Sequence, residues 1–551
     1  MVASARWPRL GAAALGFAWF LHIGGAPVLN PSNYRWLLAG DWTQHWLGWS
    51  FFRSEPWTFP IGTISSLLYP VGTSIGFTDS NPLVSLLLRP IAPWLPQDFQ
   101  FIGLWLALCF VMQGYVGAAL TSTVTKDPGQ QVLGGFLFVL SPVLVARLGH
   151  DTLCAHWLVL AMLYFGLRSY DDPARTRGVG WLLIATVMLA SAVHPYLAAM
   201  CFALGQACLV RLWRIGVFSG WRALGVAAAM TVGMIAVFGA IGYIGAAHIG
   251  SGGFGIYSAD ILALVHSAGY SFLLPEFWLA PGRTEGVGFL GLGALIGVGL
   301  AMVVLIKLRP RRVVIWPIVG ACVVMFVYAL SSDVTVASRS VVHLGFYELA
   351  STFTAAFRAS GRFVWPLHYL FLLLAVWGAV RIAGAARQSG ATALMAVLVI
   401  LQILDFRTDP SWSAPQRFRE VPTANFSGAV GAYRHLEMVP MRVLGFCGGD
   451  YDQAYISRYM LLASRLKMTF NSGIFARVAP DPVRQACVRQ DQALDAGVLD
   501  ARTVYVVVAA YLDTFRRAGA SCARFDGDWI CVSRDSDPSF RRYLDGGAAV
   551  K

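Results

Sequence analysis

Apolar segments close to the length needed to cross a bilayer recur along the first 405 residues, and they constrain the fold more than any other feature. A helix of about 20 apolar residues spans the hydrocarbon core of a membrane. Only 13% of the residues are charged, about half the usual share of a soluble domain. We therefore expect a polytopic α-helical membrane protein with about eleven spans, at residues 10–29, 99–124, 131–147, 153–168, 178–193, 195–212, 222–246, 287–306, 312–330, 362–383 and 389–405.

The basic residues divide unevenly between the two sets of connections. With a cytoplasmic N-terminus, fifteen Lys and Arg fall in the short connections 1–9, 125–130, 168–177, 211–222, 307–312 and 381–389, against eight in the longer opposite loops. Cytoplasmic loops carry such an excess, so we expect a multi-pass membrane protein whose N-terminus is cytoplasmic. The same bias accounts for the formal net charge of +13 without nucleic acid as a partner.

The acidic residues follow the opposite distribution. Three of them, Asp127, Asp171 and Asp172, fall inside, whereas ten fall in the outer loops before residue 360. Acidic residues contribute little to topology. The skew therefore indicates a polar site that faces outward.

An odd number of spans places residues 406–551 outside the cytoplasm as well. Charges become dense there, runs typical of strands occur at 441–446, 503–509 and 529–533, and a helical pattern lies around 452–466. We expect two domains: a multi-spanning membrane domain, 1–405, with a long outer first loop, 30–98, and a small α/β extracytoplasmic (periplasmic) domain, 406–551. Its four cysteines are compatible with one or two disulfides or with unpaired thiols: Cys447, Cys487, Cys522 and Cys531.

The first outer loop contains the strongest local signal, the segment GDWTQHWLGWSFFR at 40–53. Aromatic residues at helical spacing form one stripe that suits a helix in the lipid headgroup plane: Trp42, Trp46, Trp49 and Phe52. Asp41, with Gln44 three residues later, has the spacing of a capping box. Asp41 is thus an N-cap, a carboxylate presented to a lipid-linked head group, or both. The proline-rich stretch 82–96 is expected to be half-inserted or interfacial.

Three other outer segments carry polar residues that could contact a ligand. His150 and Asp151 could orient a phosphate or a sugar hydroxyl, with a simple polar turn as the alternative. Glu285 directly precedes the expected span 287–306, where an acid usually faces a cavity. Arg358 and Arg362, four residues apart, could grip a phosphate from one face. The alternative is a pair of interfacial anchors.

Together these features resemble the GT-C class of integral-membrane glycosyltransferases. The resemblance is carried by the acid after the first span, the aromatic helix, E-G-x-x-x-L-G-L-G at 285–293, F-R-x-x-G-R at 357–362 and the outer C-terminal domain. More narrowly, nearly the whole chain, including TFNSG at 469–473, resembles a bacterial set of uncharacterised membrane proteins, the DUF6311 family.

The GT-C resemblance implies transfer of a sugar from a polyprenyl-phosphate or pyrophosphate carrier on the outer face of the membrane. The implied partners are the lipid bilayer and the carrier-linked donor. Asp41 matches the first-loop acid that acts as general base or metal contact in that class. The frequent second acid of that class has no clean match here, with Asp79 and Asp151 both candidates, and this departure leaves open whether a divalent ion, Mg²⁺ or Mn²⁺, takes part.

Transfer from a phosphate-linked sugar needs a base for the acceptor hydroxyl and a cation for the leaving phosphate. We assign Asp41 as the catalytic base and Arg358 and Arg362 as the phosphate-binding pair. Residues predicted to contact substrate are Asp79, His150, Asp151 and Glu285. The alternatives are a transporter or flippase of a lipid-linked saccharide, which should carry intramembrane charges, and a non-catalytic envelope assembly protein that binds a partner through 406–551.

Overall fold

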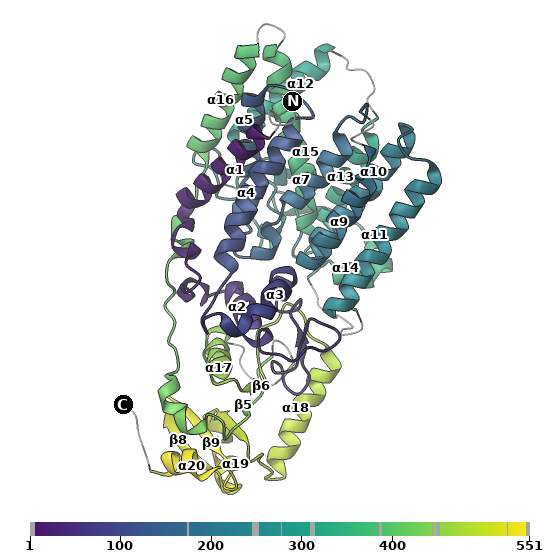
Figure 1. Cartoon of the computed structure of the whole chain (residues 1–551). Coiled ribbons are helices and arrows are strands. Elements are labelled where there is room, and N and C mark those ends of the chain that lie inside the picture. Colours follow the sequence, from purple (N-terminus) through teal and green to yellow (C-terminus); the bar gives the residue numbers. More distant parts are fainter. Residues whose placement is uncertain are drawn as a thin grey trace. The chain divides into compact units, whose positions relative to one another are not determined.

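The computed structural model describes residues 6–172, 176–244, 253–276, 278–308, 314–384, 388–443, 446–447, 452–525 and 527–546. Parts of four expected short connections, at 1–5, 173–175, 309–312 and 385–387, lie outside the described residues, as do 444–445 of one expected strand. The chain is mostly helical (Figure 1) and divides into two compact units. The first unit comprises 1–30, 101–237 and 251–413, and the second comprises 31–100, 238–250 and 414–551.

The first unit is a bundle of helices, and every apolar segment expected to span a membrane contains at least one helix. The helices are α1 (Trp7–Phe20), α4 (Ile102–Thr121), α5 (Pro128–Val139), α6 (Pro142–Val145), α7 (Trp157–Leu167), α9 (Val179–Val193), α10 (Pro195–Arg214), α11 (Gly220–Ile241), α12 (Leu292–Leu308), α13 (Trp316–Leu330), α14 (Ser351–Ala356), α15 (Trp365–Gly384) and α16 (Gln388–Asp405). The segment expected at 131–147 is divided before Pro142, because proline has no N–H to continue a helix.

Five helices among the described residues are long and apolar enough to cross a membrane. They are Ile102–Thr121, Pro195–Arg214, Gly220–Ile241, Ser360–Ala383, which includes the turn before α15, and Gln388–Asp405. Shorter apolar helices of 10–17 residues cover four more of the expected positions. Eleven spans and the cytoplasmic N-terminus stay predictions.

Packing in the first unit depends on close approach of helix backbones. A Cβ atom on Gly114 of α4 would lie 2.2 Å from the carbonyl oxygen of Ala12 in α1, so only glycine fits at this crossing. By contrast, α11 exposes large apolar side chains, including Trp221 at 85% and Val232 at 66%. An apolar helix face of this kind is favourable against lipid and unfavourable against water.

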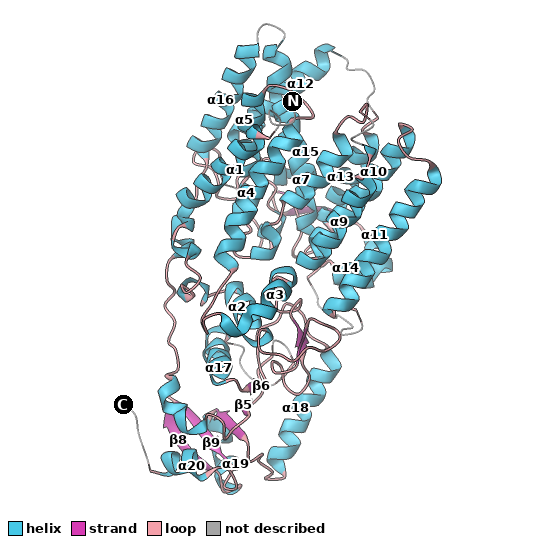
Figure 2. Cartoon of the chain, in the orientation of Figure 1, coloured by secondary structure: helices cyan, strands magenta, loops and turns pink. Residues whose placement is uncertain are grey.

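A five-stranded sheet lies in the second unit, in the order β6–β5–β7–β9–β8 (Figure 2). The strands are β5 (His435–Val439), β6 (Thr469–Phe470), β7 (Thr503–Val507), β8 (Ser521–Phe525) and β9 (Asp528–Val532). β5 pairs in parallel with β6 and β7, and β9 pairs antiparallel with β7 and β8. The helices here are α17 (Gln453–Leu466), α18 (Pro480–Asp495), α19 (Leu512–Arg517) and α20 (Pro538–Asp545). The strands expected near 503 and 529 and the helix at 452–466 are confirmed.

The strand expected at 441–446 is wrong, because β5 precedes this run and ends at Val439. Pro440 has no backbone N–H with which to continue a ladder. The next two backbone N–H groups donate instead to the side chains of Gln490 and Ser472. The apolar residues at the start of this run are buried as part of a loop.

The first outer loop belongs to the second unit. It forms α2 (Asp41–Phe52), α3 (Pro82–Leu88) and two paired two-residue strands, β1 (Thr63–Ile64) and β2 (Thr73–Ser74). Leu67 forms a parallel bridge to Phe470 of β6, and Leu68 packs into an apolar cluster with residues that follow β5. The loop therefore extends the C-terminal sheet and shares its core.

Two disulfides join the four cysteines of the C-terminal segment, Cys447 to Cys487 and Cys522 to Cys531. Disulfides persist in oxidising compartments, so these pairs are compatible with the predicted extracytoplasmic location, which stays a prediction.

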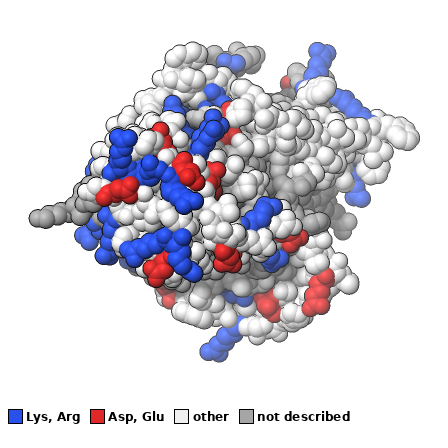
Figure 3. Space-filling view, turned by 90° about the horizontal axis from the view of Figure 1, so that it is seen from below, with Lys and Arg blue, Asp and Glu red and all other residues white. Residues whose placement is uncertain are grey.

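The face shown in Figure 3 carries Lys and Arg intermixed with Asp and Glu, as water-exposed protein surfaces do.

Candidate functional site

Four titratable side chains meet in the first unit, and we call them the Glu285 cluster. One carboxylate oxygen of Glu285 accepts hydrogen bonds from Nη1 of Arg147 and from Nε of Arg362, both at 2.7 Å. The other oxygen lies 3.7 Å from Nε2 of His150. The side chains are 5% exposed for Arg147, 12% for Arg362, 18% for Glu285 and 23% for His150. The cluster is thus largely buried and still reaches the surface.

Short 3₁₀ turns outside the α-helices position two of these side chains. Glu285 lies in the 3₁₀ turn Arg283–Gly286, and Arg362 lies in the 3₁₀ turn Ser360–Val364 just before α15. The two turns touch, because a Cβ atom on Gly361 would lie 2.6 Å from Cα of Gly286. Gly361 is therefore needed for the close approach of the two turns, and Gly286 is needed for a different contact, because its Cβ atom would lie 2.4 Å from Cα of Ala259.

The backbone between Gly286 and α12 has no regular secondary structure, and polar side chains of other helices form hydrogen bonds with its N–H and C=O groups. Nδ1 of His368 in α15 lies 2.8 Å from the carbonyl oxygen of Gly288. Gln402 of α16 donates to the carbonyl oxygen of Leu290 at 3.0 Å and accepts from the N–H of Ala294 at 3.2 Å. Buried backbone groups need such partners. The segment that carries Glu285 is therefore held rigidly.

The electrostatics of the cluster favour an ionised Glu285 and a net positive site. Burial alone would raise the pKa of Glu285, but the guanidinium groups of Arg362 and Arg147 outweigh it and hold the pKa well below its usual value. One carboxylate faces two permanent cations, so a positive charge is left over. A guanidinium has five N–H donors. Glu285 accepts one from each arginine, and the carbonyl oxygen of Thr284 accepts another from Nη2 of Arg147 at 3.0 Å. The arrangement is suited to bind an anion such as a phosphate.

The two arginines of the predicted phosphate-binding pair have different neighbours, and their joint role stays a prediction. Arg362 lies over the ring of Tyr196 at 4.7 Å and pairs with Glu285, whereas Arg358 lies over the ring of Tyr257 at 5.7 Å. Arg362 shares Glu285 with Arg147. From the sequence, Arg147 was predicted only as one of the eight basic residues of the outer loops. Its position three residues before His150, at the end of an apolar segment, was the available signal.

His150 and Asp151 separate, although they are adjacent in sequence. His150 faces Glu285, whereas Asp151 is 0% exposed and its backbone carbonyl accepts from Nε1 of Trp105 at 2.9 Å. Asp151 is therefore placed differently from His150, and its predicted contact with substrate stays a prediction.

Asp41 and Asp79 lie in the second unit. Asp41 is exposed and is the first residue of α2, and Gly40, with φ of 59°, is the N-cap residue. The N-cap interpretation of Asp41 is therefore wrong, because Gly40 is the N-cap residue and Asp41 already lies inside the helix. Glycine adopts a positive φ at the N-cap without a Cβ clash. Asp79 is half-buried in the turn before α3. Asp41 and the arginines thus belong to different units, and their expected meeting stays a prediction.

The aromatic stripe of α2 is buried in protein, which corrects the expectation of a lipid-facing helix. Trp46 and Trp49 are 1% exposed and Phe52 is 0% exposed. Tyr34 stacks on Trp46 with ring centroids 4.8 Å apart, and Nε1 of Trp46 donates to the carbonyl oxygen of Phe99 at 3.2 Å. Helical spacing of aromatic residues is the same against lipid and against a protein core, so only tertiary contacts distinguish the two.

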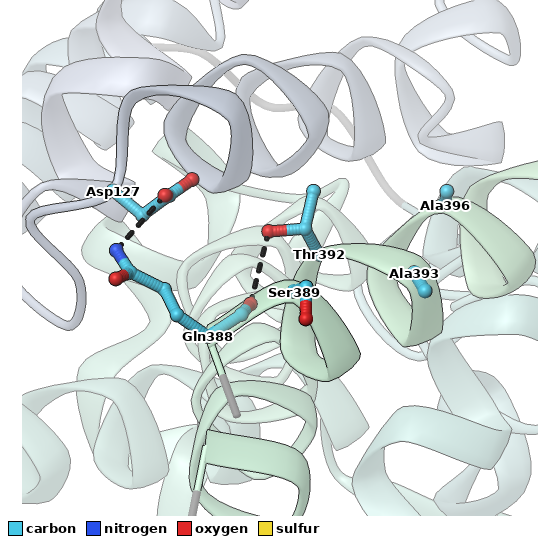
Figure 4. A pocket seen from close by; sticks show the side chains of 6 residues that line it. All are labelled: Asp127, Gln388, Ser389, Thr392, Ala393 and Ala396. Carbon is cyan, nitrogen blue, oxygen red and sulfur yellow. Dashed lines mark hydrogen bonds between the residues drawn. The ribbon is translucent and has the colours of Figure 1, made fainter. Parts of the chain in front are cut away.

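Two hollows lie elsewhere on the first unit. The hollow in Figure 4, of about 500 Å³, lies between the starts of α5 and α16. There Asp127 caps α5 through the N–H of Gln130 at 2.8 Å and accepts from the side chain of Gln388 at 3.0 Å, so its carboxylate has a structural role. The second hollow, of about 310 Å³, is lined by residues that include Tyr270, Glu276, Arg407 and Asp409.

Within the described part of the chain, no three His, Cys, Asp or Glu side chains gather closely enough to hold a metal ion. Mg²⁺ is often held by one or two carboxylates together with substrate phosphates, so the question of a divalent ion stays open.

Comparison with known proteins identifies the family. No curated protein matches the chain. The model of the domain of unknown function DUF6311 matches residues 13–407, and the model of the DUF6311 C-terminal domain matches residues 426–533. The two matches together cover both the helical region that carries the Glu285 cluster and the C-terminal sheet. The chain therefore belongs to the DUF6311 family.

Proposed function

We propose that this protein is a membrane glycosyltransferase of the GT-C type, which moves a sugar from a polyprenyl-phosphate or pyrophosphate carrier to an acceptor on the outer face of the bacterial inner membrane. The observation that carries the proposal is the Glu285 cluster, a net positive and largely buried site on the unit that contains the five span-length helices. A donor with a polyprenyl tail presents its phosphate at the membrane boundary, where such a site would meet it.

In this proposal the guanidinium groups of Arg147 and Arg362 receive the leaving phosphate. As the bond between the sugar C1 and the phosphate oxygen breaks, negative charge builds on that oxygen, and fixed cations stabilise it. Glu285 orients both arginines through its 2.7 Å contacts. Arg358 lies four residues from Arg362 and can add a further cation.

Asp41 takes the proton of the acceptor hydroxyl as its oxygen attacks C1. An exposed carboxylate at a helix start is accessible to an acceptor, and general bases of this kind contribute about 10²–10⁴-fold to rate. The role requires Asp41 to approach the Glu285 cluster in the active protein.

The binding step is tested with polyprenyl phosphate and purified protein in nanodiscs. We expect Arg362→Gln to weaken binding about 10- to 100-fold, because a charge-assisted hydrogen bond contributes roughly 1.5–3 kcal/mol. Arg484→Gln is the matched control, since that arginine is 63% exposed on α18. Equal affinities of wild type and Arg362→Gln would contradict the proposal.

The chemical step is tested in cells. Asp41→Asn should leave carrier binding unchanged and should cause the sugar-linked carrier to accumulate, as measured by mass spectrometry of extracted lipids. Asp481→Asn is the control, because Asp481 is also an exposed acid in the first turn of a helix. Normal turnover in Asp41→Asn would remove the assignment of the base.

One observation favours the transporter alternative. Polar side chains are buried inside the helical bundle, with Nδ1 of His156 2.6 Å from the hydroxyl of Tyr369 and Nε2 of His368 2.8 Å from the hydroxyl of Ser141. Polar groups at membrane depth commonly mark transport pathways. Liposomes with a fluorescent lipid-linked saccharide distinguish the two functions: movement across the bilayer without transfer, lost in His156→Phe, would favour the transporter.

A further inference from the structure

The second hollow of the first unit combines several kinds of polar group in one small space. Its volume of about 310 Å³ lies at the lower end of the range for small-molecule sites, about 300–1,000 Å³. Glu276 and Asp409 supply carboxylates, Arg407 supplies a guanidinium, and Tyr270 supplies an aromatic ring. The Glu285 cluster does not use any of these groups.

The two walls of the hollow are joined to each other before any ligand binds. The N–H of Arg407 donates to the carbonyl oxygen of Tyr270 at 3.1 Å, and Ser271 forms an antiparallel bridge with Phe406. Asp405, which is 1% exposed, accepts the hydroxyl of Ser271 at 2.7 and 2.8 Å. The backbone of the hollow is therefore fixed before a ligand binds, whereas the exposed side chains of Glu276, Arg407 and Asp409 lose rotamer freedom when they order around it.

The hollow and the Glu285 cluster are connected through the end of α16. Gln402 holds the backbone of Leu290, in the segment that follows Glu285, and Asp405 one turn later holds the wall that contains Tyr270. Burial raises the pKa of Tyr270, and the positive charge of Arg147 acts against that rise. The phenol is therefore within electrostatic reach of Arg147.

The chemistry of the lining selects a polyhydroxylated ligand. Carboxylates accept hydrogen bonds from hydroxyl groups, a guanidinium donates to ring and hydroxyl oxygens, and an aromatic face covers the apolar C–H face of a sugar ring. Two carboxylates against one guanidinium leave a net negative charge, which repels a phosphate. The hollow thus has the opposite net charge to the anion-binding Glu285 cluster, and it suits the uncharged sugar rather than the phosphate.

We propose that this hollow binds the pyranose or furanose ring of a glycosyl substrate, next to the phosphate held by the Glu285 cluster. The proposal rests on the proposed function and deepens it. Glu276 and Asp409 accept the sugar hydroxyls, Arg407 donates to an oxygen, and Tyr270 covers one face. The ring belongs to the carrier-linked donor or to a sugar acceptor, and the two sources share this chemistry.

The experiment compares three probes on full-length protein in nanodiscs: bare polyprenyl phosphate, sugar-linked polyprenyl phosphate, and a panel of soluble methyl glycosides followed by saturation-transfer NMR. We expect Glu276→Gln to weaken binding of a sugar-bearing probe about tenfold, because a neutral amide accepts more weakly than a carboxylate. Glu348→Gln is the matched control, since Glu348 is an exposed acid of the same unit outside the hollow.

The outcomes separate this proposal from the proposed function. A tenfold loss for the sugar-linked carrier alone supports a donor subsite, and a loss for the methyl glycosides supports a sugar site whether or not any carrier binds. Bare polyprenyl phosphate should be unaffected by Glu276→Gln and weakened by Arg362→Gln. If no sugar-bearing probe binds, or if Glu276→Gln and Glu348→Gln bind them equally, the hollow is not a sugar site.

Discussion

Replacing Glu285 by Gln should destabilise the first unit by about 3 kcal/mol. The carboxylate pairs with Arg147 and Arg362 at 2.7 Å, and the two guanidinium groups are only 5% and 12% exposed. Removing one partner of a buried ion pair typically costs about 3–5 kcal/mol, because the remaining charge is left uncompensated. The lower end applies here, because 18% of the Glu285 side chain is exposed and water can screen the site.

A double-mutant cycle measures the ion pair itself. Arg362→Gln removes one cation, and the double variant Glu285→Gln/Arg362→Gln removes that cation together with the carboxylate. We expect a coupling energy of about 1.5–3 kcal/mol, as for residues in one salt-bridge network. The assay is hydrogen exchange of the peptides around 285 and 362 in nanodiscs, which reports the local free energy of opening. Glu348→Gln, an exposed control, should change it by less than about 0.5 kcal/mol.

The pH dependence of the same variant has a defined sign. A carboxyl group whose native pKa lies below its unfolded pKa stabilises the fold above the unfolded value, and this contribution is lost as the pH falls through the native pKa. The native pKa of Glu285 is depressed below the ordinary value of 4.5. The wild type should therefore lose stability below about pH 4, and Glu285→Gln should flatten this profile. A coupling energy near zero, or an unchanged acid limb, would refute the reasoning.

Three further predictions concern stability. Burial raises the pKa of Glu437 to about 7 from 4.5, so the folded state holds its proton more tightly than the unfolded state does. The free energy of opening of the sheet, measured by hydrogen exchange, should therefore fall by up to about 3 kcal/mol as the pH rises from 4.5 to 7. In Glu437→Gln it should not depend on pH over this range. Gly114→Ala should destabilise the first unit by about 1–3 kcal/mol in thermal unfolding, whereas Gly225→Ala, with nothing within 4 Å of its Cβ position, should be neutral or stabilising. Removing the Cys447–Cys487 disulfide, with a separation of 40 residues, should cost about 4 kcal/mol in denaturant unfolding, and an unchanged midpoint would contradict it.

The helices of the first unit could be predicted from the sequence, and the role of α2 could not. An apolar run shows that a segment avoids water. It does not show whether lipid or a protein interior takes the place of water. Trp46 and Trp49 fit the pattern of an interfacial helix, yet both are 1% exposed, and Trp46 stacks on Tyr34. The failure at 441–446 has a similar cause, because buried loop residues and strand residues share an apolar composition.

The candidate site was predictable one residue at a time. Glu285, Arg362 and His150 were each singled out by a polar side chain next to an apolar segment, and the structure brings these three together. The sequence did not predict that Arg147 and Arg362 both pair with Glu285. Arg147 and Glu285 are 138 residues apart, and Glu285 and Arg362 are 77 apart.

The sequence by itself determined the helical first unit, the mixed C-terminal region and the family. These properties depend on composition and periodicity over short windows, and such local preferences persist in any tertiary arrangement. Only the tertiary structure decided which charges neutralise one another, that the first loop joins the C-terminal sheet, and which aromatic residues are buried. Those outcomes depend on contacts between distant segments, whose free energy comes from removing both partners from solvent together.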